Sequence, residues 1–133
     1  MAEQPAKLNF TLMIVEDEEN VRNVFADVLR RRFEFVLTAE NGLKGLDLYK
    51  VNKPDIIITD IRMPEMDGLT MAREIRNINP NVSIIVLSAY DDIKHLLLAT
   101  DIGIEAYVSK PIKREELLEA LDKAILKAKR FKV

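Results

Sequence analysis

Five short apolar runs, separated by longer amphipathic stretches, limit most strongly how this chain can fold. The runs lie at residues 12–15, 35–37, 56–58, 84–87 and 106–108. Three of them are continuous aliphatic runs without polar alternation, which is typical of strands covered on both faces. The flanking runs are less uniform. A strand alternating with a helix five times predicts an α/β fold, with a parallel sheet and helices on both of its faces.

The stretches between these runs have helical periodicity. In the first, an amphipathic stripe with i, i+3, i+4, i+7 and i+8 spacing predicts a helix packed on the core. The stripe consists of Val21, Val24, Phe25, Val28 and Leu29. Asp17 or Glu18 is placed to begin this helix, and the three arginines at 30–32 to end it. Four further helices are expected at about 42–51, 69–78, 91–100 and 114–129, with Gly103 as a stop signal after the fourth.

Length and composition indicate one ordinary globular domain. The chain has 133 residues, of which 48% are hydrophobic and 32% charged, a balance typical of folded rather than disordered proteins. We expect the domain to cover residues 10–129, with tails at 1–9 and 130–133. The net charge of −2 gives no electrostatic footprint for nucleic acid. No signal-peptide core or membrane-spanning run is present, so a cytoplasmic protein is the expectation.

Polar side chains follow four of the five predicted strands. Glu16 and Asp17 follow the first, Asp60 ends the third, Ser88 ends the fourth and Lys110 follows the fifth. The carboxyl ends of parallel strands form the functional edge of such a sheet. Crowded carboxylates repel one another, and an all-oxygen ligand set favours a hard cation, above all Mg²⁺. Together with a lysine and a hydroxyl, this arrangement predicts a site that stabilises a phosphoryl group on an aspartate.

Each of these residues also has an ordinary structural explanation. Asp17 could cap the next helix, Lys110 could be a solvated surface residue, and Ser88 could belong to an ordinary loop. The set at one sheet edge, and not any single member, is the basis of the functional hypothesis.

Six short motifs resemble those of response regulator receiver domains, over residues 10–129. The motifs are VEDE, AENG, PDIIITD, MPEMDG, LSA and KP, at residues 15–18, 39–42, 54–60, 63–68, 87–89 and 110–111. The resemblance implies a flavodoxin-like fold, with five parallel strands in the order 2-1-3-4-5 and five helices. It also indicates a cis bond between Lys110 and Pro111.

The resemblance further implies a role for each acidic residue. Asp60 would accept a phosphoryl group from a sensor histidine kinase or a phosphotransfer protein. Asp17 would bind Mg²⁺ directly, together with Asp60 and the backbone carbonyl of Arg62. Glu16 would act on the metal mainly through water. Such domains catalyse their own phosphorylation and dephosphorylation without being conventional turnover enzymes.

The remaining implied roles concern the response to phosphorylation. Lys110 and Ser88 would contact the phosphoryl group, and Tyr107 would move inward as Ser88 moves. This movement would switch the face formed by the fourth helix, the fifth strand and the fifth helix. Arg62 and Tyr90 occupy positions that tune the phosphoryl lifetime in this family. Bulky side chains there would shield the acyl phosphate, and pairing of Arg62 with a neighbouring acid is the alternative.

The sequence leaves partners and alternatives open. An output domain or a separate target protein would receive the signal, and a homodimer through the switching face is left undecided. A docking module that is never phosphorylated is the main alternative. An aspartyl phosphatase would usually carry an acid where Arg62 stands. A nucleotide or flavin binder would have a glycine-rich loop in place of the acidic residues 16–19.

Overall fold

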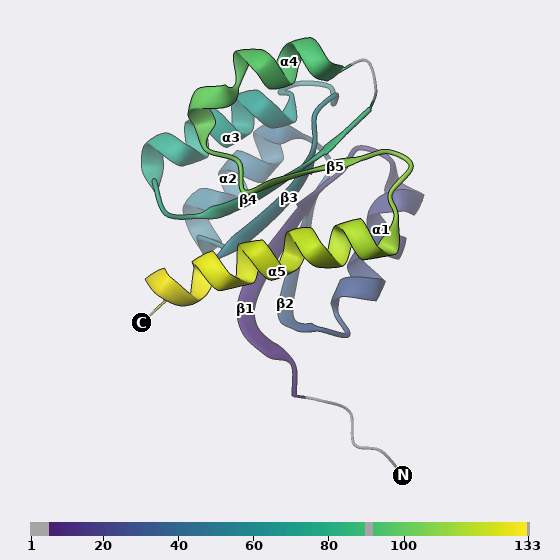
Figure 1. Cartoon of the computed structure of the whole chain (residues 1–133), viewed down its shortest axis with the longest axis vertical. Helices are drawn as coiled ribbons and strands as arrows, with labels where there is room; N and C mark the ends of the chain where they lie inside the picture. The colour runs from purple at the N-terminus through teal and green to yellow at the C-terminus, as the bar shows by residue number, and fades with distance from the viewer. Residues whose placement is uncertain (1–5, 90–91, 133) are drawn as a thin grey trace.

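The computed structural model describes residues 6–89 and 92–132. In these residues, strands and helices alternate along the chain as expected (Figure 1). The strands are β1 (Leu8–Val15), β2 (Phe33–Ala39), β3 (Ile56–Asp60), β4 (Ser83–Ser88) and β5 (Ala106–Ser109). The helices are α1 (Glu19–Leu29), α2 (Gly42–Asn52), α3 (Gly68–Ile78), α4 (Ile93–Leu98) and α5 (Arg114–Phe131), with a 3-10 turn, η2 (Thr100–Ile102), after α4.

The five strands form one parallel sheet in the order β2-β1-β3-β4-β5, which confirms the predicted topology. Helices α1 and α5 cover one face, and α2, α3 and α4 lie on the other (Figure 1). Successive side chains of a strand point to opposite faces. Ile56 and Ile58 therefore enter the core under α1 and α5, while Ile57 enters the core under α2 and α3.

Burial follows the predicted difference between central and edge strands. Every residue of β3 and β4 is buried, as the continuous aliphatic runs indicate. On the edge strands, Phe35 in β2 and Tyr107 in β5 are 53% and 42% exposed. The central strands are therefore fully covered, while each edge strand leaves an aromatic side chain partly exposed.

The predicted core face of α1 is confirmed only in part, because Leu29 and Phe25 pack on the core but the valines of the stripe do not. Val21, Val24 and Val28 are 40%, 65% and 49% exposed, whereas Leu29 and Ala26 are buried. Small Ala26 packs on the core below α1, which turns the valine stripe outward, toward the beginning of α5. An apolar stripe on a helix predicts a surface that packs against other apolar groups. It does not indicate whether those groups belong to the same domain or to another protein.

The fourth helical segment is shorter than expected. A helix was predicted at 91–100, but α4 covers only Ile93–Leu98 and is followed by η2. Gly103, the predicted stop signal, follows η2 with a left-handed φ of 76°. The start predicted at Asp91 lies outside the described residues. Leu97 is 67% exposed and Leu96 is partly buried, so α4 presents apolar surface as well as packing on the core.

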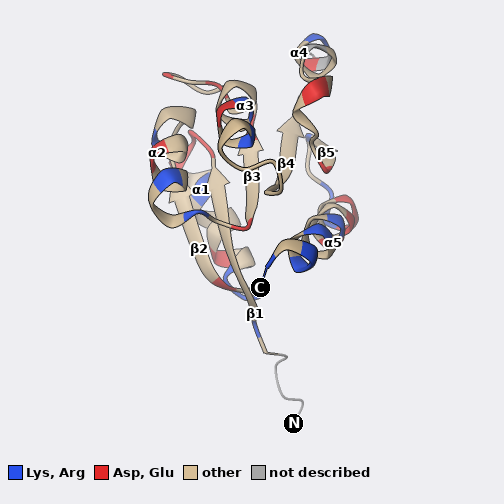
Figure 2. Cartoon of the chain, turned by 90° about the vertical axis from the view of Figure 1, so that its left-hand side faces the viewer, with Lys and Arg blue, Asp and Glu red and all other residues tan. Residues whose placement is uncertain are grey.

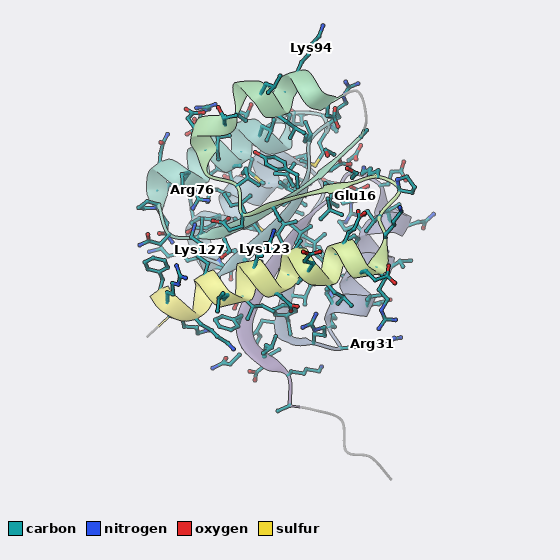
Figure 3. The ribbon with its side chains drawn as sticks, viewed as in Figure 1. Glu16, Arg31, Arg76, Lys94, Lys123 and Lys127 are labelled. Carbon is teal, nitrogen blue, oxygen red and sulfur yellow. The ribbon has the colours of Figure 1, made fainter. Side chains whose placement is uncertain are left out.

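A polar network joins the elements at the amino ends of β4 and β5. The Arg76 guanidinium donates to the carbonyls of Ile102, Gly103 and Val82 at 2.9, 2.8 and 2.5 Å. Glu105 accepts from the Ile84 amide and pairs with Lys127 of α5. Figure 3 shows Arg76 and Lys127 at the opposite end of the sheet from Glu16. This network fastens α3 and α5 to the sheet, away from the predicted site.

Charged residues of both signs are interspersed over the helices, including α5 (Figure 2). This mixture agrees with the net charge of −2. None of the described helices is long and apolar enough to cross a membrane.

Candidate functional site

Three carboxylates converge where β1 and β3 end. Glu16 and Asp17 follow β1 directly, and Asp60 is the last residue of β3. Because Val15 pairs with Thr59 in the parallel register, the residues that follow must leave the sheet side by side. Carboxylate oxygens of all three residues lie within 4.8 Å of one another. Glu16 and Asp60 are buried and Asp17 is exposed, so the cluster opens to solvent on one side.

Asp60 is held by groups from two strands. Its Oδ2 accepts a hydrogen bond from Lys110 Nζ at 2.6 Å, and its Oδ1 accepts from the backbone amide of Ile61 at 2.8 Å. Lys110 follows β5, two strands away from β3, and the predicted cis bond to Pro111 is present. The tertiary fold is therefore what places a cation against the predicted acceptor.

The carboxylate cluster changes the proton affinity of its members. Burial raises the pKa of Glu16 to about 7, and the neighbouring Asp60 adds to this by sharing a hydrogen bond and by its charge. The charge of Lys110 opposes this rise. For Lys110, burial would lower the pKa, but the hydrogen bond and charge of Asp60, with Glu16 and Asp17, raise it overall. The site thus resists holding all its negative charges without additional positive charge.

One oxygen of the cluster lacks a protein partner. Glu16 Oε2 is buried, and no group of the described residues donates a hydrogen bond to it. A buried acceptor of this kind is costly unless an ion or water satisfies it. The ligand set is entirely carboxylate oxygen, which suits a hard, hydrated cation such as Mg²⁺. The donor set and the unsatisfied oxygen therefore fit the predicted magnesium site.

Close packing explains the glycine of the MPEMDG motif. A Cβ at position 68 would lie 1.8 Å from the backbone oxygen of Asp60. The Gly68 amide donates to the Ile61 carbonyl at 2.8 Å, which holds the start of α3 over the end of β3. Asp67 caps this helix by accepting from the Thr70 amide at 2.8 Å. The motif thus supports the backbone that presents Asp60.

Ser88 and Tyr107 occupy different surroundings. Ser88 ends β4 one residue beyond Leu87, the register partner of Asp60, and its carbonyl accepts from the Lys110 amide at 2.8 Å. It is buried at the same edge as the carboxylates. Tyr107 lies on β5 away from this edge, where it lines an outer surface with Glu116, Glu119 and Lys123, among others. Tyr90, which was predicted together with Arg62 to tune the lifetime of the phosphoryl group, lies outside the described residues.

Arg62 makes an ion pair with an acidic residue. The sequence indicated such a pair as an alternative but did not identify the acid. Arg62 Nε donates to Oδ1 of Asp92 at 2.7 Å, so the acid considered as a partner for Arg62 lies 30 residues further along the chain. Oδ2 of Asp92 accepts from the Ala89 amide at 2.8 Å, and the Asp92 side chain is only 2% exposed. Asp92 was missed because an aspartate at the start of a predicted helix is expected to be exposed to solvent.

A parallel 2-1-3-4-5 sheet with an acidic cluster and a lysine at its carboxyl edge is the arrangement found in receiver domains. The sequence profile of the response regulator receiver domain matches residues 12–122. The chain therefore belongs to the response regulator receiver domain family of two-component signalling.

Individual relatives agree with this assignment. The chain is 36% identical to chemotaxis protein CheY of Bacillus subtilis (strain 168) over 115 residues, which cover 86% of this chain and 96% of that protein. It is 32% identical to transcriptional regulatory protein GlrR of Escherichia coli (strain K12) over 94% of this chain but only 27% of that protein. A receiver domain protein from Clostridium thermocellum superposes with a TM-score of 0.85 at 29% identity, over 92% of this chain and 99% of that one.

Proposed function

We propose that this chain is a phosphorylation-dependent switch whose Asp60 accepts a phosphoryl group from a sensor histidine kinase or a phosphotransfer protein. The observation that carries this proposal is the buried Asp60 carboxylate, which Lys110 contacts at 2.6 Å beside an acidic pair with one unsatisfied oxygen. The alternative, a docking module that is never phosphorylated, gives no reason to keep three carboxylates and a lysine together.

The proposed reaction is a direct displacement at phosphorus. A carboxylate oxygen of Asp60 forms a bond to phosphorus as the phosphorus–nitrogen bond of the donor histidine breaks. The bonding electron pair remains on the imidazole nitrogen, which then takes up a proton. Lys110 exchanges its hydrogen bond to Asp60 for one to a phosphoryl oxygen, where its charge stabilises the charge of the transferred group.

Mg²⁺ fits the remaining part of the site. Asp17, Asp60 and the backbone carbonyl of Arg62 would hold it, with Glu16 acting through water. When bound, the ion supplies positive charge to the phosphoryl oxygens and to the crowded carboxylates. The same chemistry with water as the attacking group accounts for autodephosphorylation.

The phosphodonor needs a surface beside the site. An apolar groove of about 570 Å³ lies between α1 and the start of α5. Its apolar lining consists of Val21, Val24, Phe25, Val28, Ile112 and Leu117. Ile112 is two residues after Lys110, so one end of the groove belongs to the segment that carries the lysine of the site. We propose that an apolar helical surface of the phosphodonor covers this groove and brings its histidine to Asp60.

The output would use another face. The Ser88 hydroxyl would turn toward the phosphoryl group, and Tyr107 would move inward from its half-exposed position on β5. The face formed by α4, β5 and α5 would then change its shape for an output domain, a separate target protein or a second copy of the chain. Relatives such as GlrR, of which this chain covers 27%, are consistent with an attached output domain.

Intact mass spectrometry tests this function. The wild-type protein would be incubated with acetyl phosphate and Mg²⁺, beside Asp60→Asn and a sample with chelator. We expect a single phosphoryl adduct in the wild type alone. A folded wild-type protein that takes up no phosphoryl group from acetyl phosphate or phosphoramidate would refute the switch and favour the docking module.

A further inference from the structure

We propose that Arg62 is a phosphoryl-binding residue whose access to the phosphoryl group is controlled by Asp92. In the structure described above, Arg62 pairs with Asp92. In the phosphorylated protein it exchanges this partner for the phosphoryl oxygens on Asp60. This inference rests on the proposed phosphorylation of Asp60. It adds Asp92 as a positioning residue, which acts by holding the Arg62 guanidinium.

A single buried carboxylate joins the two loops beside the site. Asp92 Oδ1 accepts from Arg62 Nε at 2.7 Å, and Asp92 Oδ2 accepts from the Ala89 amide at 2.8 Å. The Asp92 amide also donates to the Ala89 carbonyl at 3.1 Å. The Asp92 side chain is 2% exposed and the Arg62 side chain 57%. The carboxylate is thus fixed in place, while the guanidinium it holds lies at the surface.

Both ends of this link attach to residues of the phosphorylation site. Arg62 is two residues after Asp60, and Ala89 directly follows Ser88. In the proposed switch the loop after β4 moves together with Ser88, and this backbone movement displaces the Ala89 amide. That displacement weakens one of the two hydrogen bonds that orient the Asp92 carboxylate. The movement proposed for Ser88 therefore weakens the hold on Arg62 at the moment when a new anion forms two residues away from it.

The charges favour the exchange. A phosphoryl group on Asp60 offers more negative charge and more acceptor oxygens than the carboxylate of Asp92. A guanidinium binds phosphate oxygens through two parallel hydrogen bonds. Because Arg62 is more than half exposed, its side chain can reorient without disturbing the core. Asp92 thus competes with the phosphoryl group for the same cation.

The surface offers a matched control. Arg73 and Asp101 form an ion pair of the same 2.7 Å length between α3 and η2. Both side chains are about half exposed or more, at 46% and 67%. Asp101→Asn therefore removes a comparable arginine–aspartate contact that involves no residue of the phosphorylation site.

The test compares binding of beryllium fluoride, a phosphoryl mimic, in the presence of Mg²⁺. The variants are Asp92→Asn, Asp101→Asn, Arg62→Met and the double variant Arg62→Met/Asp92→Asn. Asp92 accepts from Arg62 and from the Ala89 amide through two different oxygens. Asparagine has only one side-chain oxygen, so it cannot accept both hydrogen bonds in the same way. We expect Asp92→Asn to bind about fivefold more tightly than the wild type, and Arg62→Met about fivefold more weakly. Asp101→Asn should match the wild type.

The double variant and a spectroscopic measurement distinguish positioning from general stability. If Asp92 acts through Arg62, the double variant binds like Arg62→Met, and the two effects are not additive. In the wild-type protein, the NMR signal of the Arg62 Nε–H should shift when beryllium fluoride binds, a result that requires no variant to fold. An unshifted Arg62 signal, or Asp92→Asn binding like Asp101→Asn, overturns the exchange while the proposed function stands. A wild-type protein that binds no beryllium fluoride overturns both.

Discussion

Replacing Glu16 with glutamine should make the protein more stable at alkaline pH when divalent cations are absent. Burial raises the pKa of this carboxyl from 4.5 to about 7, and Asp60 adds to the rise. Folding therefore favours the protonated acid. The stability that Glu16 contributes is complete below pH 4.5 and is lost as the pH rises through about 7. Glutamine remains neutral at every pH and keeps nearly the same shape.

The size of this effect follows from the pKa difference between the folded and unfolded chains. One pKa unit corresponds to about 1.4 kcal/mol, so a rise from 4.5 to about 7 gives up to about 3 kcal/mol at pH 8. We expect Glu16→Gln to exceed the wild type by roughly this free energy of unfolding at pH 8 in chelator. At pH 5 the difference should be small, because Glu16 is then protonated in the folded wild type.

Urea unfolding at pH 5 and pH 8 measures this difference. Glu18→Gln, at an exposed position two residues further on, is the matched control and should leave the pH dependence unchanged. Adding Mg²⁺ at pH 8 should stabilise the wild type more than Glu16→Gln, because a bound cation stabilises the folded state that holds it. Equal stability of the wild type and Glu16→Gln at pH 8 in chelator would refute the reasoning.

Two further predictions concern the packing of Gly68 against the Asp60 backbone and the docking of the phosphodonor. Gly68→Ala should lower the free energy of unfolding by about 2 kcal/mol or more in urea titrations, because its Cβ would lie 1.8 Å from the Asp60 carbonyl oxygen; an unchanged midpoint would contradict the tight packing. Val24→Glu, in the groove of α1, should slow phosphotransfer from a cognate histidine kinase about tenfold or more but leave labelling by acetyl phosphate unchanged. Val51→Glu, at an 81% exposed position on α2, is its control, and equal kinase rates for the two variants would exclude the groove as the docking surface.

Several parts of the fold and site could be predicted from sequence because they depend on local pattern and on general rules for parallel sheets. The runs at 56–58 and 84–87 are aliphatic throughout, which is typical of strands covered on both faces. Their carboxyl ends must then lie at one edge, which brings Asp60 and Ser88 together without knowledge of any distance. The strand order, by contrast, came only from the resemblance to receiver domains.

The features that were missed depend on tertiary packing. Val24 and Val28 have the spacing of a core face, yet they are exposed. Leu29 of the same stripe is buried as expected, together with Ala26, which lies outside the stripe. Asp92 is charged and lies at the start of a helix, yet it can be buried because Arg62 and the Ala89 amide satisfy both of its oxygens. Neither result can be read from periodicity, since each depends on which residue of another element lies opposite.

The chemical location of the phosphoryl group tests the central claim most directly. Borohydride reduces an aspartyl phosphate to homoserine, so the wild-type protein treated with acetyl phosphate and Mg²⁺ can be reduced, digested and sequenced by mass spectrometry. The account predicts homoserine at position 60 and at no other aspartate. Homoserine at Asp17 or another acid, or a stable phosphate on Ser88, would contradict it.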